Sequence, residues 1–348
     1  MEPQKVILSD HIDVTLAQAI DACPHDRLLV LVDETTRRCC LSVVSDMAPM
    51  QGAEVITIGA TDQHKTLDSV THVWSELQRL GATRHSLLVN LGGGMVTDLG
   101  GFAASTFKRG IQFINIPTTL LAMVDASVGG KTGFNFGGLK NEIGVFSNAS
   151  SVIIDTTFLK TLDEENILSG YAEMLKHGLI DTEKHWAELL SEEAVVTRPD
   201  LADVLARSIA VKQRIVMEDP TEKGLRKALN LGHTAGHAFE SLALERHPVL
   251  HGYAVAWGLV VELWLSSVKA GFPTPQMRQT VNFIREHYGR MAITCDDYPQ
   301  LLALMHHDKK NVGNDINFTL LGGIGDIRID QHVSEDDIKE ALDFYREY

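Results

Sequence analysis

The chain has few cysteines, no long apolar run and a deficit of positive charge. Its 348 residues include four cysteines, Cys23, Cys39, Cys40 and Cys295. None forms a CxxC pair, and the adjacent pair has poor geometry for a disulfide, so we expect reduced thiols. No segment approaches the ~18 consecutive apolar residues of a membrane span. The first residues lack the basic and apolar regions of a secretory signal. We therefore expect a cytoplasmic protein that does not associate with membranes.

Negative charge outweighs positive charge throughout the chain. Lysine and arginine number 31 against 46 aspartates and glutamates, which gives a formal charge of −15. This excess argues against non-specific binding to nucleic acid or to an anionic membrane surface. If the substrate is an anion, positive charge must be gathered locally, so the positions of individual lysines become informative.

Short apolar runs alternate with helical patterns in the first half of the chain. The runs are rich in β-branched residues, which is typical of strands buried on both faces of a parallel sheet. Between them, residues 65–80 carry apolar side chains at helical spacing, and Gly81 supplies a C-terminal stop. This alternation predicts a Rossmann-like α/β fold with a mainly parallel sheet. The expected strands span residues 5–9, 28–34, 54–59, 86–94, 111–117 and 151–155.

After about residue 157 the strand patterns nearly vanish. Only residues 316–323 and 324–330 suggest a late hairpin. The sequence therefore predicts an α/β domain over residues 1–157 and a mostly α-helical domain over residues 158–348. The helical patterns span residues 164–180, 201–217, 234–244, 253–271 and 275–289.

Two glycine-rich segments are candidate phosphate sites. The stretch DASVGGKTGFN, residues 125–135, predicts a loop, but a Walker A motif needs glycine where Asp125 stands. A P-loop ATPase is therefore excluded, because the motif lacks its first glycine and carries a negative charge where phosphate oxygens would lie. The segment NLGGGMVTDLGG follows an expected strand and opens a helix, as a dinucleotide site would. It fails the GxGxxG pattern at Thr97, so a plain strand-to-helix turn is an equal alternative from the residues alone.

Histidines and a carboxylate give a candidate metal site in the second half. His233 and His237 are spaced i, i+4, on one helix face. His251 begins another expected helix, and Glu173 lies on an earlier one. Three of these four residues would suit a tetrahedral zinc ion with one open position. The segment is not HExxH, since Thr234 follows the first histidine, so a zincin protease is excluded.

These segments together resemble the 3-dehydroquinate synthase family. The resemblance rests on GGGMVTDLGGFAASTFKRG, IPTTLLAMVDASVGGKTGFN, LKNEIG, AEMLKHGLI, GLRKALNLGHTAGHAFE and HGYAVAWG, in order and with matching spacing from about residue 28 to residue 325. It implies an NAD-binding domain joined to a helical metal-binding domain. It also implies conversion of 3-deoxy-arabino-heptulosonate 7-phosphate to 3-dehydroquinate and phosphate in the shikimate pathway, with NAD regenerated in each turnover.

The resemblance also implies roles for individual residues. A zinc or cobalt ion would be held by Glu173, His233 and His251. His237 then becomes a substrate-side residue, and one of Lys309 and Lys310 would also contact substrate. Arg109 would reach the neighbouring subunit's site, which implies a homodimer. The full set of implied catalytic and substrate residues is Asp125, Lys131, Asn141, Lys176, Lys212, Arg226, Asn230, His237 and Arg109.

NAD would contact residues that follow the expected strands. Asp62 stands where the family usually has glutamate, which keeps the charge and shortens the reach. Tyr253 replaces a glutamate next to the metal-binding histidine segment. The implied NAD contacts are Asp33, Asp62, Lys65, Gly93, Gly94, Asp98, Thr118, Thr119, Lys140, Phe158, Thr161 and Leu162.

Two related activities remain as alternatives at this point. Another sugar phosphate cyclase, of the 2-deoxy-scyllo-inosose synthase type, shares the NAD and metal sites but binds no substrate carboxylate. A metal-dependent alcohol dehydrogenase of the glycerol dehydrogenase type shares the two-domain plan. Lys212 and Arg226 favour the first-named family, because an arginine fork matches a carboxylate.

Overall fold

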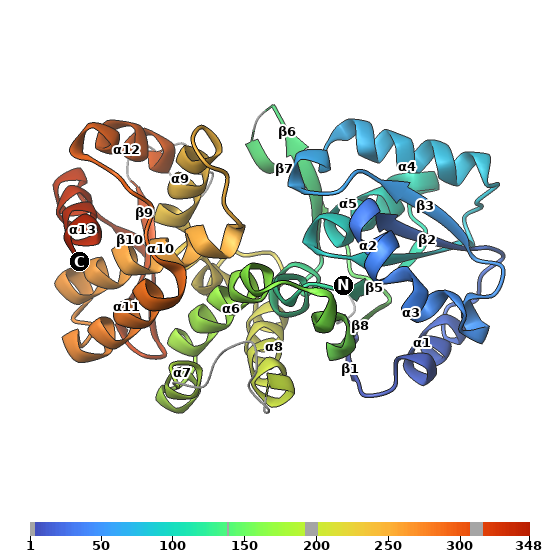
Figure 1. The fold of residues 1–348 in the computed structure, drawn as a ribbon, viewed down its shortest axis with the longest axis horizontal. Coiled ribbons are helices and arrows are strands. Elements are labelled where there is room, and N and C mark those ends of the chain that lie inside the picture. Colours follow the sequence, from blue (N-terminus) through green and yellow to red (C-terminus); the bar gives the residue numbers. More distant parts are fainter. Residues whose placement is uncertain (1–3, 138, 192–200, 307–315) are drawn as a thin grey trace. The chain divides into compact units, whose positions relative to one another are not determined.

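The computed structural model describes residues 4–137, 139–191, 201–306 and 316–348. The chain divides into two compact units, Met1–Asp163 and Glu164–Tyr348 (Figure 1). The 3-10 turn η5 (Thr156–Thr161) follows the last strand of the first unit and belongs to it. The domain boundary after residue 157 stays a prediction.

A six-stranded sheet forms the centre of the first unit. All of its strand pairs are parallel, in the order β1-β8-β5-β4-β2-β3. The strands that the sequence predicts are all present, and the expectation of a Rossmann-like α/β fold is confirmed. Four strands, β2, β4, β5 and β8, are almost fully buried, which explains their unbroken apolar runs. The strands are β1 (Val6–Ser9), β2 (Leu28–Asp33), β3 (Glu54–Ile58), β4 (Leu87–Gly92), β5 (Gln112–Pro117) and β8 (Ser151–Asp155).

Helices connect these strands and pack on the sheet. The expected helix over residues 65–80 is observed as α4, which buries Val70, Val73 and Leu77 along one face. Thr66 caps it by accepting a hydrogen bond from Ser69 N, because a threonine hydroxyl can satisfy a first-turn N–H. The helices of this unit are α1 (Ile12–Asp21), α2 (Glu34–Cys39), α3 (Leu41–Ser45), α4 (Leu67–Arg79) and α5 (Gly94–Thr106).

The carboxyl ends of the parallel strands meet at one edge of the sheet. The chain leaves β2 for β3 on one side and then returns to β4 on the other, so the strand order reverses between β2 and β4. In open α/β sheets ligands bind beside such a reversal, beyond the strand ends. β4 and β5 end in register, at Gly92 and Pro117, and Thr118 N donates to Gly92 O at 3.0 Å. The segments after these strands are therefore candidates for a ligand site.

The glycine-rich stretch 125–135 is only partly a loop. Residue 131 begins strand β6 (Lys131–Phe136), which pairs antiparallel with β7 (Leu139–Phe146). The expectation of a loop is therefore wrong for residues 131–135. Gly133 and Gly144 face one another in this hairpin, and a Cβ on Gly133 would lie 2.5 Å from Ile143 O. Glycine is needed there for close backbone approach, and its low strand propensity hides the strand from sequence patterns.

The second unit is mostly helical, as the sequence predicts. α10 lies at its centre, buried on nearly every side, and contacts α6, α9, α11 and α13. The expected late hairpin is present as antiparallel β9 and β10. The elements are α6 (Glu164–Leu179), α7 (Glu183–Leu189), α8 (Leu201–Glu218), η6 (Leu225–Asn230), α9 (His233–Leu244), α10 (His251–Leu265), η7 (Ser266–Ala270), α11 (Thr274–Tyr288), α12 (Tyr298–His306), β9 (Asn317–Gly323), β10 (Asp326–His332) and α13 (Glu335–Glu347).

Helices α9 and α10 approach so closely that their backbones touch. A Cβ added to Gly258 would lie 2.0 Å from Gly232 O and 2.6 Å from Gly236 N. No side-chain rotamer can relieve a contact with backbone atoms, so the helices would have to separate. Glycine at these positions sets the spacing between the two helices.

We expect Gly258→Ala to destabilise the chain by at least about 2 kcal/mol, because overpacking here displaces a whole helix. Urea denaturation followed by circular dichroism measures the loss. Gly323→Ala is the matched control, since a Cβ there meets nothing within 4 Å. Equal stability of the two variants would show that the helices are not held by this contact.

Candidate active site

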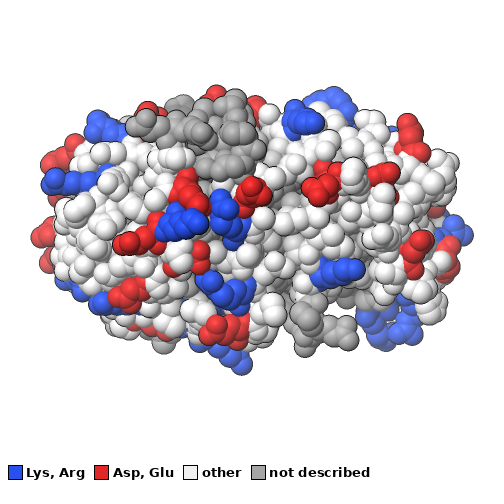
Figure 2. Space-filling model, turned by 90° about the horizontal axis from the view of Figure 1, so that it is seen from below, with Lys and Arg blue, Asp and Glu red and all other residues white. Residues whose placement is uncertain are grey.

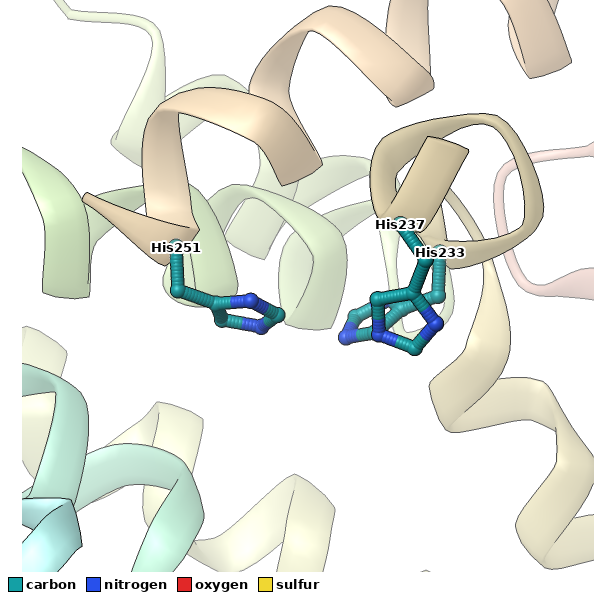
Figure 3. Close-up of side chains that lie close together, drawn as sticks. All are labelled: His233, His237 and His251. Carbon is teal, nitrogen blue, oxygen red and sulfur yellow. The ribbon is translucent and has the colours of Figure 1, made fainter. Parts of the chain in front are cut away.

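Three histidines of the second unit point toward one another. His233 and His237 lie one turn apart on α9, and His251 is the first residue of α10 (Figure 3). The ring centroid of His233 lies 5.3 Å from that of His237 and 5.5 Å from that of His251. One ring nitrogen of each histidine lies within 4.8 Å of the others. The i, i+4 spacing and the close helix crossing together produce this cluster.

Glu173 of α6 brings a carboxylate to the same cluster. Its side chain is fully buried, and Oε1 lies 3.3 Å from His233 Nε2 and 3.6 Å from His251 Nε2. The other oxygen, Oε2, pairs with the ammonium of Lys176, so Oε1 is the oxygen that faces the imidazoles. Burial would raise the pKa of Glu173, but the positive charge of Lys176 and His233 holds it well below its usual value. Glu173 is therefore a buried anion facing two imidazole nitrogens.

This geometry fits a tetrahedral metal ion. Zinc–ligand bonds of about 2.0–2.1 Å at tetrahedral angles place neighbouring ligand atoms ~3.3 Å apart. The two distances from Glu173 Oε1 to the histidine nitrogens, 3.3 and 3.6 Å, match that separation. Lys176 neutralises the Oε2 side of this buried carboxylate, and a metal ion at Oε1 would satisfy the other side. The nitrogen and oxygen donors are also those that zinc and cobalt accept.

Further groups fix the orientation of the histidine rings. His251 Nδ1 lies 3.2 Å from Glu240 Oε2, and His233 Nδ1 lies 3.1 Å from Leu231 O. In both rings Nδ1 contacts an oxygen atom, and Nε2 faces Glu173. Burial lowers the pKa of His251, but the charge of Glu240 and hydrogen bonds to Glu173 and Glu240 raise it overall to about 10. The surroundings of this ring thus favour a cation.

Glu240 is a site residue that the sequence analysis missed. It is buried on α9 and lies seven residues after His233, which places it on the same helix face. That spacing was the available signal. The spacing alone does not predict a site residue, because glutamate is common on solvated helix faces. Only the tertiary structure shows that this glutamate is buried.

Three basic residues predicted for substrate in the second unit, Lys176, Lys212 and Arg226, are buried. Lys176 is one turn after Glu173 and forms an ion pair with its Oε2. Lys212 of α8 and Arg226 of η6 are 6% and 1% exposed. Buried cations are expensive, so they indicate a site that handles anions.

Arg226 and Asn230 lie in the 3-10 turn η6, and the loop before it holds them in place. Asp219 Oδ2 accepts hydrogen bonds from Gly224 N at 2.7 Å and from Arg226 N at 3.1 Å. Arg226 Nη1 donates to Pro220 O at 2.6 Å, and Asn230 Nδ2 donates to Glu222 Oε1 at 3.0 Å. These bonds join the loop to η6, which carries both predicted substrate residues.

In the first unit, most of the predicted NAD residues follow strand ends. Asp33 ends β2, Gly93 and Gly94 follow β4, and Thr118 and Thr119 follow β5. Asp62 and Lys65 follow β3, while Thr161 and Leu162 come after β8. Because all these strands are parallel, the structure brings the residues to one edge of the sheet. α5 begins there at Gly94, and its N-terminal N–H groups favour an anion such as a pyrophosphate.

Two of the predicted NAD residues also stabilise the fold of the first unit. The Asp33 carboxylate accepts a hydrogen bond from Thr36 N at 2.8 Å and so caps α2. The Phe158 side chain is fully buried and packs in the core. Cys40, which the sequence analysis left as a reduced thiol, lies 3.7 Å from Thr161 Oγ1 through its sulfur. Burial raises the pKa of this thiol.

A polar network joins the loop after β3 to the β6–β7 hairpin. Lys65 is buried, and its ammonium forms an ion pair with Asp98 at 2.6 Å and a hydrogen bond with Asn141 Oδ1. Lys140 Nζ lies 3.3 Å from Asp62 Oδ2. The structure therefore brings Asn141, predicted for substrate, beside two residues predicted for NAD.

Asn135 holds this network together, and the sequence analysis did not single it out. Its Nδ2 donates to Asp62 Oδ2 at 3.1 Å, and its Oδ1 accepts from Asn141 N at 3.0 Å. Its backbone N donates to Lys65 O at 2.8 Å. Asn135 lies in the part of the hairpin that the sequence predicts as loop, so its partners across the strand could not be anticipated.

The remaining predicted residues of the first unit lie on turns or, for Lys131, at the start of a strand. Asp125 lies in the π-helical turn η4 (Ala122–Ala126), and Lys131 is the exposed first residue of β6. Gly129 and Gly130 between them have φ of +105° and +67°, which bends the chain into the hairpin. Arg109 is exposed, with φ of +72°. Lys309 and Lys310 lie outside the described residues.

Exposed charges of both signs are mixed on the surface. On the face shown in Figure 2, lysine and arginine side chains are interspersed with aspartate and glutamate, and neither sign covers a continuous area. Among the residues that the structure describes, none of the helices combines the length and the apolar character needed to cross a bilayer.

Comparisons with known proteins show which family this chain resembles. A family model for the N-terminal part of 3-dehydroquinate synthase matches residues 55–169, and one for its C-terminal part matches residues 170–311. A curated 3-dehydroquinate synthase from Parabacteroides distasonis is 51% identical over 349 aligned residues, which cover 100% of this chain and 99% of the relative.

Solved structures of similar proteins extend the comparison. A 2-epi-5-epi-valiolone synthase from Streptomyces hygroscopicus, solved with NAD⁺ and Zn²⁺ bound, has a TM-score of 0.89 at 27% identity and covers 100% of this chain and 98% of its own. A 2-deoxy-scyllo-inosose synthase, with a TM-score of 0.85 at 23% identity over 98% of this chain and 96% of its own, shares the fold. Since the family models match more than half of the chain and the 51% identity spans its full length, the chain belongs to the 3-dehydroquinate synthase family.

Proposed function

We propose that this chain converts 3-deoxy-arabino-heptulosonate 7-phosphate to 3-dehydroquinate and phosphate, with NAD held by the first unit and a divalent metal by the second. Full-length similarity to 3-dehydroquinate synthases supports this activity. The structural observation that carries it is the buried Glu173 carboxylate, whose Oε1 faces His233 Nε2 and His251 Nε2 at the spacing of tetrahedral ligands. Glu173, His233 and His251 are thus the proposed metal ligands.

The bound groups supply two kinds of chemistry. A divalent ion held by Glu173, His233 and His251 would supply Lewis-acid polarisation of substrate hydroxyls, and NAD held by the first unit would supply transient hydride acceptance. The chain's own residues hold the substrate in position and bind its charged groups. With the metal held by Glu173, His233 and His251, His237 is left on the same helix face to contact substrate.

Different residues are proposed to bind the two anionic ends of the substrate. Lys212 and Arg226 are proposed to bind the carboxylate, for which the planar guanidinium is well suited. Lys131, Asn141, Asn230 and His237 are proposed to hold the phosphate until it leaves. Asp125 and Lys176 orient the hydroxyls between these ends. Because binding already holds the flexible polyol in a reactive pose, less entropy is lost in reaching the transition state.

Incubation of the chain with the heptulosonate phosphate, catalytic NAD and zinc tests the activity. We expect release of phosphate without net formation of NADH, because NAD is regenerated in each turnover. Phosphate is measured colorimetrically and NADH by absorbance. Stoichiometric NADH would instead support a dehydrogenase. Absence of turnover with this substrate would support another sugar phosphate cyclase.

Glu240→Gln tests the metal assignment independently of activity. The substitution removes the charge that holds His251 Nδ1, and loss of such a partner weakens metal binding by about 10- to 100-fold. Competition with a chromophoric chelator measures the zinc affinity. Glu245→Gln removes the same charge just after α9 without contacting either ring, and should leave the affinity unchanged. An unchanged affinity in Glu240→Gln would contradict the assignment of His251.

We also propose that the chain acts as a cytoplasmic homodimer in which Arg109 reaches the partner's site. The exposed side chain of Arg109 supports this proposal, since a residue that contacts a partner subunit must lie on the surface of its own subunit.

Mixing two inactive variants tests this arrangement. Arg109→Ala and His233→Ala are expected to be inactive alone. Co-expressed, they form mixed dimers in which one site has both residues, so about a quarter of the wild-type activity returns. Lys108→Ala is the matched control, since the neighbouring exposed lysine has no proposed role. Failure to recover activity in co-purified mixed dimers would show that Arg109 acts within its own subunit.

A further inference from the structure

Glu262 is a fully buried glutamate that has no place in the proposed chemistry. It lies on α10, and its exposed fraction is 0%. Its Oε2 accepts a hydrogen bond from Gly232 N at 2.6 Å, and its Oε1 accepts one from Ala235 N at 3.1 Å. Both donors belong to the beginning of α9. One carboxylate on α10 therefore binds the N-terminus of the neighbouring helix with both oxygens.

The beginning of α9 cannot satisfy these N–H groups locally. Its N-cap residue is Gly232, which has no side chain to accept a hydrogen bond. Glycine is required there because φ is +80° and because a Cβ would lie 2.8 Å from the Leu259 side chain. The close approach of α9 to α10 thus removes the ordinary cap. Glu262 supplies it from across the interface.

The charge of Glu262 also suits its position. A helix N-terminus carries a partial positive charge, so a buried carboxylate there gains both hydrogen bonds and a favourable dipole. The first turn that it binds contains His233, the first residue of α9. The helix that carries Glu262 begins with His251, about three turns earlier.

Glu262 therefore connects the two elements that present the histidines to Glu173. A shift of α9 along α10 would change the separation of His233 and His251. The two hydrogen bonds oppose that shift, because Oε1 and Oε2 must reach two different N–H groups at once. The contact between Gly258 and Gly232 sets how close the helices lie, and Glu262 sets how they are aligned.

We propose that Glu262 is a positioning residue of the metal centre, which fixes the first turn of α9 against α10 so that His233 and His251 meet one ion. This inference rests on the proposed function through the assignment of Glu173, His233 and His251 as ligands. Glu262 acts through the backbone of α9 and touches neither substrate nor cofactor in this role.

The test is the metal affinity of Glu262→Gln in the full chain, without substrate or NAD. Glutamine keeps the shape but turns an NH2 group toward one of the two backbone donors. We expect zinc affinity, measured by chelator competition, to fall by about 10- to 100-fold. We also expect the visible absorption of the cobalt-loaded chain to change in position or intensity, because the ligand geometry is altered.

Thr280→Val is the matched control. Thr280 is also fully buried and accepts a hydrogen bond from Trp186 Nε1 at 2.9 Å, but it lies on α11. We expect it to lower the melting temperature without changing zinc affinity or the cobalt spectrum. If Glu262→Gln behaves like this control, Glu262 is only a structural residue and the proposal is overturned.

Two further variants keep the outcome decisive. If Glu262→Gln does not fold, Glu262→Asp keeps the charge and shortens the reach, and wild-type zinc affinity in that variant would overturn the proposal. His233→Ala tests the assignment on which the inference rests. If His233→Ala binds zinc as tightly as the wild type, the metal assignment fails and this inference fails with it. A weakened His233→Ala beside an unaffected Glu262→Gln overturns the inference alone.

Discussion

The Glu173 carboxylate lies fully buried among Lys176, His233 and His251. An unpaired carboxylate at this depth would be strongly unfavourable, so the positive groups around it are a condition for its position. Bringing them there requires α6, α9 and α10 to meet closely. Gly252 makes this possible on one side, since a Cβ there would lie 1.9 Å from Ser169 O of α6. The packing of the second unit is thus organised around one charged side chain.

Three buried glutamates contact the histidine cluster or the helices that carry it, each in a different way. Glu173 faces the two imidazoles, Glu240 orients one of them through Nδ1, and Glu262 holds the helix that carries the other. The first unit relies on backbone geometry instead. Its parallel strands end together, and the residues that follow them converge without long side chains. Lys65, Asp98 and Asn135 then tie this edge to the β6–β7 hairpin.

Most of the elements were predictable because their signals are local. The six sheet strands have apolar runs buried on both faces, and α4 and α8 carry clear helical spacing. The β6–β7 hairpin was missed because Gly133 and Gly144 serve close backbone approach and weaken the strand pattern. Glu240 was missed because a glutamate within a helix often faces solvent. Glu262 lies in an otherwise apolar helix, which does indicate burial, but its partners at the start of α9 are not visible in the sequence. The same holds for Asn135, whose partners lie far away in the sequence.

The sequence by itself determined the α/β and helical halves, the order of their elements and the family, because periodicity and long motifs are properties of the chain. It also determined which residues could serve a metal, with four candidates left open on spacing alone. The tertiary structure decided that Glu173 Oε1 meets His233 Nε2 and His251 Nε2 at ligand spacing. It also decided which carboxylates support them. The physical reason is that distances between α6, α9 and α10 depend on contacts between backbones, which no single segment encodes.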